Sequence, residues 1–194
     1  MELSGRQLKA LMKITHRSTT PETKDIFFVC DDALFFASEY SVIKISLAHN
    51  IDYPSCPDGM AACIIPEYIT YNIPYNKIKV NDRWEITSGE LRKKDKTGKT
   101  LESISPKYPK ENPKLTREGL EKIVNPKDSS FFTKGIEVRI NPDLASECIS
   151  AMNELCDSII ISSDNLYITG HSYNQTPRGM IEKIDFTIAG MRKQ

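Results

Sequence analysis

The sequence predicts an α+β fold in which antiparallel sheets carry helices on one face. β-prone segments occur in pairs separated by short turns, as in Asp25–Cys30 and Ala33–Ser38, which is typical of β-hairpins. Helix-start signals with apolar periodicity are fewer and do not alternate regularly with the strands, which argues against a parallel βαβ array. We therefore expect mostly antiparallel sheet with a small number of covering helices.

The first helix is expected to begin at Ser4, because Gln7 lies three residues later in a capping-box spacing. Its apolar stripe is Leu8, Leu11 and Met12, and it should end before His16. The hairpin follows, with Asp31-Asp32 as its turn. Further strands of the N-terminal half are expected at Tyr40–Leu47, Lys77–Val80 and Trp84–Thr87, the last two forming a hairpin. Ala62–Ile73 is expected to be a strand with a short irregular turn, and Glu90–Arg92 to begin one more strand.

Between Arg92 and Lys114 the composition changes. Eight basic residues face three acidic ones, and Pro106, Pro109 and Pro113 lie among them. Such a stretch is typical of a turn followed by a linker. We therefore predict two domains, residues 1–104 and a shortened one at residues 105–194, with one domain that carries a long insertion as the alternative.

The C-terminal half contains the strongest helix start in the chain, the Asn141-Pro142 pair, which supplies an N-cap and a first-turn proline. The predicted apolar face of this helix ends at Leu155. A shorter helix, Thr116–Val124, precedes it. Strands are expected at Ile136–Ile140, Ser158–Ile161, Leu166–Thr169 and Ile184–Ala189, and no short-period repeat is visible.

Charge and cysteine content limit the classes of function. The 194-residue, 22.0 kDa chain has 26 basic and 26 acidic residues, so its bulk charge does not attract it to nucleic acid, although local basic patches can. Its five cysteines form no Cys-x-x-Cys pair, which favours free thiols in the cytoplasm. No apolar run reaches the length of a membrane helix, and we expect no membrane partner.

No arrangement of residues predicts catalysis, a cofactor or a metal. The three histidines lie in different predicted loops. One loop gathers His49, Asp52, Cys56 and Asp58, which could hold a metal, but aspartate and proline are also ordinary turn residues and we favour that interpretation. Cys148 and Cys156 lie on or beside an apolar helix face, where cysteine is usually a packing residue.

Three basic residues of the first helix, Arg6, Lys9 and Lys13, are spaced so that they share one face. Such a row can contact nucleic-acid phosphates. It can equally be a solvated helix face, and the spacing alone does not decide between the two.

Several segments resemble bacterial DNA sliding clamps, and they occur in the same order. In the N-terminal half these are Phe36–Ile45, Cys63–Pro66 and Trp84–Gly89. In the C-terminal half they are Val138–Leu144, Cys156–Ile161 and Phe186–Arg192.

The resemblance implies a DNA-clamp-like fold and a non-enzymatic processivity factor of DNA replication, encoded by a phage or mobile element. It further implies binding of duplex DNA without sequence specificity, a DNA polymerase or other replication protein as partner, and three copies closing a homotrimer ring. The DNA-binding residues it implies are Arg6, Lys9, Lys13, Lys114, Arg117 and Lys122.

Two other hypotheses stay open. The Asn141–Leu155 helix carries Asp143, Glu147 and Glu154 and no basic residue, whereas clamps line their central hole with basic helices. That favours a clamp-fold protein-interaction module that does not encircle DNA. The third hypothesis is an enzyme that uses the His49–Asp58 loop and a bound metal.

Overall fold

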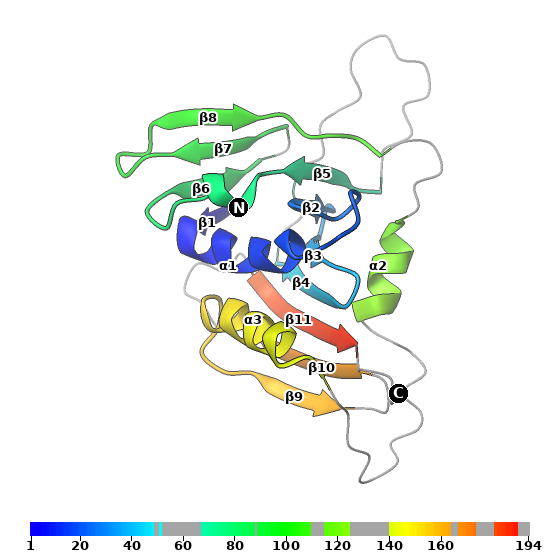
Figure 1. The fold of residues 1–194 in the computed structure, drawn as a ribbon. Helices are drawn as coiled ribbons and strands as arrows, with labels where there is room; N and C mark the ends of the chain where they lie inside the picture. The colour runs from blue at the N-terminus through cyan, green and yellow to red at the C-terminus, as the bar shows by residue number, and fades with distance from the viewer. Residues whose placement is uncertain are drawn as a thin grey trace.

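The computed structural model describes residues 1–48, 51, 67–87, 89–109, 115–124, 140–163, 167–173 and 181–189. Within these residues the chain forms a mixed α+β structure with two antiparallel sheets and three α-helices (Figure 1). The prediction of an α+β fold with antiparallel sheets is confirmed.

The larger sheet has seven strands in the order β5-β2-β3-β4-β11-β10-β9. Their bounds are β2 (Ile26–Val29), β3 (Ala33–Ala37), β4 (Ser41–Leu47), β5 (Ile69–Asn72), β9 (Ile160–Ser163), β10 (Tyr167–Tyr173) and β11 (Ile181–Ala189). The pairing of β4 with β11 is antiparallel and sets Ile43 opposite Phe186. The expected first hairpin is β2 and β3, and it is confirmed.

The order of the larger sheet shows an internal symmetry that the sequence does not reveal. The helix α1 (Gly5–His16) is followed by β2, β3 and β4, and the helix α3 (Pro142–Asn153) is followed by β9, β10 and β11. The last strand of each unit pairs with the other, so the central order β2-β3-β4-β11-β10-β9 is palindromic. Two similar helix–three-strand units are thus joined through β4 and β11.

α1 and α3 lie against the same face of the larger sheet and pack on each other (Figure 1). Leu8 and Leu11 of α1 and Met152 of α3 share one buried cluster with Phe36 and Ile43 of the sheet. Both predicted helix N-termini, at Ser4 and at Asn141-Pro142, are confirmed. Ser4 and Gln7 form the capping box at α1, and Asn141 accepts a hydrogen bond from the Asp143 N–H ahead of a first-turn proline in α3.

The remaining helix, α2 (Arg117–Val124), packs on the opposite face of the larger sheet. Its Leu120 and Val124 share a second buried cluster with Phe28 and Phe35. The expectation that the helices occupy one face is therefore wrong for α2. The physical reason is that all five residues of β3 (Ala33–Ala37) are buried, so both faces of the sheet need cover.

The smaller sheet has the order β1-β6-β7-β8, with β1 (Glu2–Ser4), β6 (Arg83–Ile86), β7 (Leu91–Lys94) and β8 (Thr100–Ile104). The predicted hairpin between residues 77–80 and 84–87 is wrong, because β6 pairs with β1 and β7. Tyr75–Lys77 form a short 3₁₀ helix, η1, and residues 79–82 form a turn. Residues 92–104, expected to be a turn and linker, instead form most of β7 and all of β8.

The division into residues 1–104 and 105–194 stays a prediction. The larger sheet and its main core take residues from both sides of that boundary, since β4 pairs with β11 and α1 packs on α3. The predicted strand at Ile136–Ile140 lies, up to residue 139, outside the described residues.

Gly170 provides a test of the joined sheet. It lies opposite Phe186 in the β10–β11 register, and a Cβ at this position would come within 2.1 Å of the buried Phe186 ring. We expect Gly170→Ala to lower the free energy of unfolding by about 1–3 kcal/mol because the ring must shift in a packed core. Gly89→Ala, where a Cβ would meet nothing within 4 Å, is the matched control. Equal denaturant midpoints for the two variants would contradict this packing.

Candidate nucleic-acid interface

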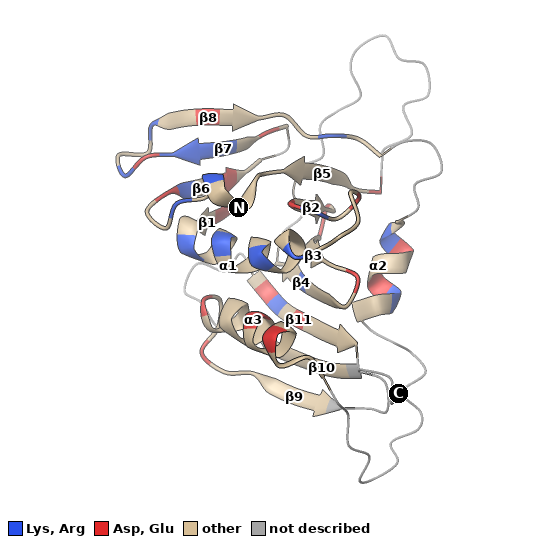
Figure 2. Ribbon diagram, in the orientation of Figure 1, with Lys and Arg blue, Asp and Glu red and all other residues tan. Residues whose placement is uncertain are grey.

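Burial places the basic row on the side of α1 that faces away from the sheet, and Figure 2 shows the basic positions along this helix. Leu8, Leu11 and Met12 are buried beneath the helix, while the Arg6 side chain is 67% exposed and the Lys13 side chain 49% exposed. The sheet therefore places these cations where a large anion could approach them.

Two of the three cations are already paired with α3. Arg6 Nε lies 4.0 Å from Glu154 Oε2, and Lys13 Nζ lies 3.5 Å from Glu147 Oε1. Arg17, just after α1, brings its Nε within 2.7 Å of the same Glu147 oxygen. The acidic residues of α3 and its C-cap therefore balance the basic residues of α1.

These pairs differ in how firmly they hold their cations. Glu147 is only 3% exposed, so removing a cation from beside it would leave a buried charge poorly compensated, at a cost of about 3–5 kcal/mol for a fully broken pair. The Arg6–Glu154 contact is long and exposed, and such pairs contribute about 0–1 kcal/mol. Arg6 can exchange its partner readily, whereas Lys13 shares a fixed carboxylate with Arg17.

Lys9 turns away from α3 and toward η1. Its Nζ lies 5.3 Å from the centre of the Tyr75 ring, a cation–π contact. The same ring stacks on His16 at 4.7 Å between centroids, and His16 Nδ1 lies 2.8 Å from Asp25 Oδ1. Lys9 thus forms no ion pair with a carboxylate among the described residues and contacts η1 instead.

Arg117 and Lys122 lie on the other side of the larger sheet, on α2. The Arg117 guanidinium forms ion pairs with both aspartates of the β2–β3 turn. Its Nη1 lies 2.7 Å from Asp31 Oδ1 and its Nη2 2.7 Å from Asp32 Oδ1. Burial acts to lower the pKa of Arg117, but the hydrogen bond to Asp31 and the nearby charges raise it above its usual value. These two ion pairs connect α2 to the β2–β3 turn of the larger sheet.

Lys122 forms an exposed ion pair with Glu118 one turn away, at 2.8 Å. Lys114 lies outside the described residues. The structure thus groups Arg6, Lys9 and Lys13 on α1 and places Arg117 and Lys122 on the opposite face.

The structure adds two lysines that the sequence did not associate with α1. Lys77 ends η1, and Lys79 lies in the turn whose last residue, Asp82, accepts a hydrogen bond from the Gly5 N–H at 2.7 Å. Because residues 77–80 were expected to form a strand, the sequence did not predict that these two lysines lie near the start of α1. The signal available in the sequence was the apolar Ile78 between two lysines, a pattern that a tight turn produces as well as a strand does.

The buried cysteines lack the features of a nucleophile. Desolvation by burial raises the pKa of Cys30 to about 12. Burial, together with the adjacent Glu147 charge, raises the pKa of Cys148 to about 12 as well. Both thiols therefore stay protonated at neutral pH.

Metal binding has no site in the described part of the chain, where no three His, Cys, Asp or Glu side chains come together. The candidate loop with His49, Asp52, Cys56 and Asp58 lies outside that part. The metal hypothesis for this loop therefore stays a hypothesis.

Comparison with protein-family models and with curated proteins finds no match for this chain. Among the described residues no helix is long and apolar enough to span a membrane. Function must therefore be argued from the arrangement of the side chains.

The role of Arg117 can be tested by stability. We expect Arg117→Ala to lower the free energy of unfolding by about 1 kcal/mol, because two partly exposed aspartates lose a shared charged partner. Lys122→Ala removes an exposed pair within one helix and should cost about 0.3–0.5 kcal/mol. Urea midpoints of the two variants decide the matter, and an Arg117→Ala midpoint no lower than that of Lys122→Ala would remove the anchoring role.

Proposed function

We propose that the protein is a clamp-like, non-enzymatic processivity factor of DNA replication that contacts duplex DNA through the outward face of α1. The observation that supports this best is the row formed by Arg6, Lys9 and Lys13, in which Arg6 and Lys13 are exposed and Lys9 is half-buried, on a helix whose other side is buried against the sheet. The order of clamp-like segments in the sequence gives independent support. α2 lies on the opposite face and is not part of the proposed contact.

Contacts of this type would be made to phosphates. Lysine and arginine at a helix surface neutralise backbone charge without contacting base edges, so binding depends on salt and not on sequence. A protein held in this way can move along the duplex, as a processivity factor must.

The acidic residues of α3 are compatible with this function. An arriving phosphate would compete with Glu154 for Arg6, an exchange between two exposed anions that costs little. Glu147 would retain Arg17, at 2.7 Å, when Lys13, at 3.5 Å, turns to a phosphate, so the two helices would stay together. DNA would therefore lie over α1 and toward the side away from α3.

Assembly into a ring of three copies is the second element of the proposal. Within the described residues β9 ends the larger sheet and has a partner on one side only. Its Ile160 and Ile161 are 56% and 54% exposed, on opposite faces of the strand. An exposed apolar edge strand is a template for pairing with another chain, and a second copy would cover it.

A protein-interaction module is the second candidate function. The specific observation in its favour is that Arg6 and Lys13 on one face, and Arg117 on the other, are all engaged in ion pairs within the chain. A protein that retains no duplex DNA at low salt but captures a polymerase or another replication protein would fit this candidate instead.

The α1 contact predicts a change in salt dependence. We expect the triple replacement of Arg6, Lys9 and Lys13 by Ala to reduce the slope of log affinity against log salt by about 0.9 for each phosphate that is no longer neutralised. The measurement is fluorescence anisotropy with a labelled duplex. Lys122→Ala, on the opposite face, should keep the wild-type slope. A triple variant with the wild-type slope would exclude this row from the interface.

The ring predicts a mass. Light scattering behind a sizing column should give about 66 kDa, three times the 22.0 kDa chain. Ile161→Lys places a charge on the β9 edge and should return the mass to that of one chain. Ile123→Lys, an exposed position on α2, should leave it unchanged. A wild type of 22.0 kDa at every concentration would contradict the ring.

A further inference from the structure

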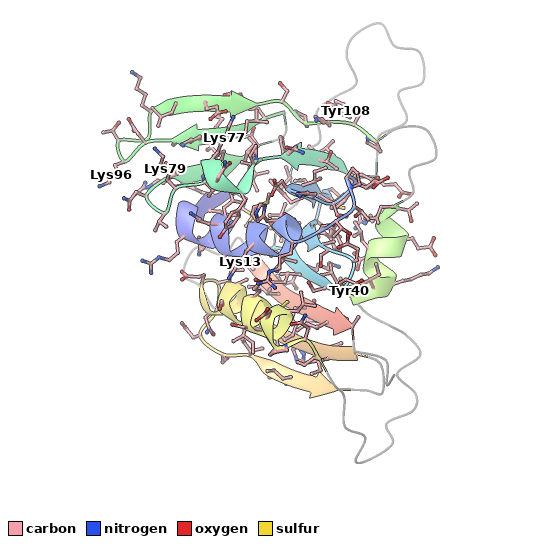
Figure 3. All side chains as sticks on the ribbon, in the orientation of Figure 1. Lys13, Tyr40, Lys77, Lys79, Lys96 and Tyr108 are labelled. Carbon is pink, nitrogen blue, oxygen red and sulfur yellow. The ribbon has the colours of Figure 1, made fainter. Side chains whose placement is uncertain are left out.

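The end of the smaller sheet carries lysines that are not used inside the described part of the molecule. Lys77 and Lys79 precede β6, while Lys96 and Lys99 lie in the turn between β7 and β8. None of the four forms an ion pair with any described residue. Three of them, Lys77, Lys79 and Lys96, are seen together on this side of the molecule, next to the beginning of α1 (Figure 3).

Most acidic residues around them are already occupied. Asp82 accepts Lys93 Nζ at 2.9 Å, and Glu85 accepts Lys94 Nζ at 2.8 Å. Glu2 lies 3.9 Å from Arg83, and Glu90 pairs with Arg92. Glu102 adds one exposed charge on β8, opposite Lys93 in the register. The strands therefore neutralise themselves, and the excess positive charge gathers at the turns.

The turn between β7 and β8 is held in a defined shape. Asp95 Oδ1 accepts hydrogen bonds from the Thr97 N–H at 2.8 Å, from Thr97 Oγ1 at 2.6 Å and from the Lys99 N–H at 3.0 Å. Gly98 has φ of 86°, a left-handed conformation that glycine adopts without strain. Asp95 is thereby committed to the backbone of the turn and does not pair with the ammonium group of Lys96 or Lys99.

This surface is continuous with α1. The Gly5 N–H donates to Asp82 O at 2.7 Å, and a Cβ on Gly5 would lie 2.0 Å from Lys79 O, so the turn is pressed against the first residue of the helix. Lys9 reaches the same region through Tyr75, two residues before Lys77. A polyanion lying on α1 would meet these lysines next.

We propose that Lys77, Lys79, Lys96 and Lys99, which we call the sheet-end lysines, form a second phosphate-binding surface for the same duplex DNA. This proposal rests on the proposed function and extends it, because it places the stronger anion contact on cations that have no ion-pair partner among the described residues. The ligand chemistry is the sugar–phosphate backbone of duplex DNA, met by ammonium groups that act as point charges and carry no sequence information.

The test compares three full-length proteins on labelled duplexes of two unrelated sequences, titrated between about 50 and about 200 mM salt. One variant replaces the four sheet-end lysines with Gln, the second replaces them with Arg, and the third protein is the wild type. For each phosphate that is no longer neutralised, the change in affinity across this range should shrink roughly 3.5-fold. We expect this reduction in the Gln variant, equally on both sequences, and the wild-type salt dependence in the Arg variant.

The outcomes separate this proposal from the proposed function. A Gln variant with the wild-type slope overturns the proposal that the sheet-end lysines bind phosphate, and it leaves the proposed function standing. A reduced slope in the Arg variant as well overturns the proposal, because charge would then not be the cause. A wild type that shows no salt-dependent binding of duplex DNA overturns the proposed function itself. Circular dichroism melting of both variants, expected to match the wild type, excludes loss of fold as the reason for weaker binding.

Discussion

The antiparallel pairing of β4 with β11 is the constraint on which the rest of the structure depends. It runs from the Ser41–Ile188 pair to the Leu47–Ile181 pair and joins two helix–three-strand units into one sheet. Because each unit brings its helix to the same face, the pairing forces α1 and α3 into contact over a shared core. The charges on the two helices must then be compatible at short range.

This contact explains why a basic helix and an acidic helix occur together. Glu147 is buried where α3 meets the end of α1, and it is tolerated there because Lys13 and Arg17 both reach it. An acidic α3 is thus a consequence of packing against α1 and does not by itself argue against an anion-binding face. It does determine which cations are paired inside the molecule and which face solvent.

Local signals in the sequence predicted the local structure well. The capping box at Ser4, the Asn141-Pro142 helix start and the hairpin of aromatic strands all depend on neighbours within a few residues. Two failures are local, since residues 79–82 form a turn and residues 92–104 form most of β7 and all of β8. The others are non-local. The pairing of β6 with β1 joins segments far apart in the chain, and no local pattern shows that Trp84 lies opposite Leu3. The same limit applied to the candidate site, since the partner of Arg6 is Glu154, which follows a helix far along the chain.

The separation of paired and unpaired cations follows from strand geometry. In the β6–β7 register Glu85 lies opposite Arg92, whereas Lys93 and Lys94 reach carboxylates diagonally. Their partners, Asp82 and Glu85, lie two residues from the positions directly opposite, at 2.9 Å and 2.8 Å. At a turn the register ends, and Lys96 and Lys99 have no facing strand. The one acidic residue of that turn, Asp95, accepts hydrogen bonds from the backbone N–H groups of Thr97 and Lys99. A chain with no net charge can in this way present a local positive surface, because many of its described carboxylates form ion pairs where strands and helices meet.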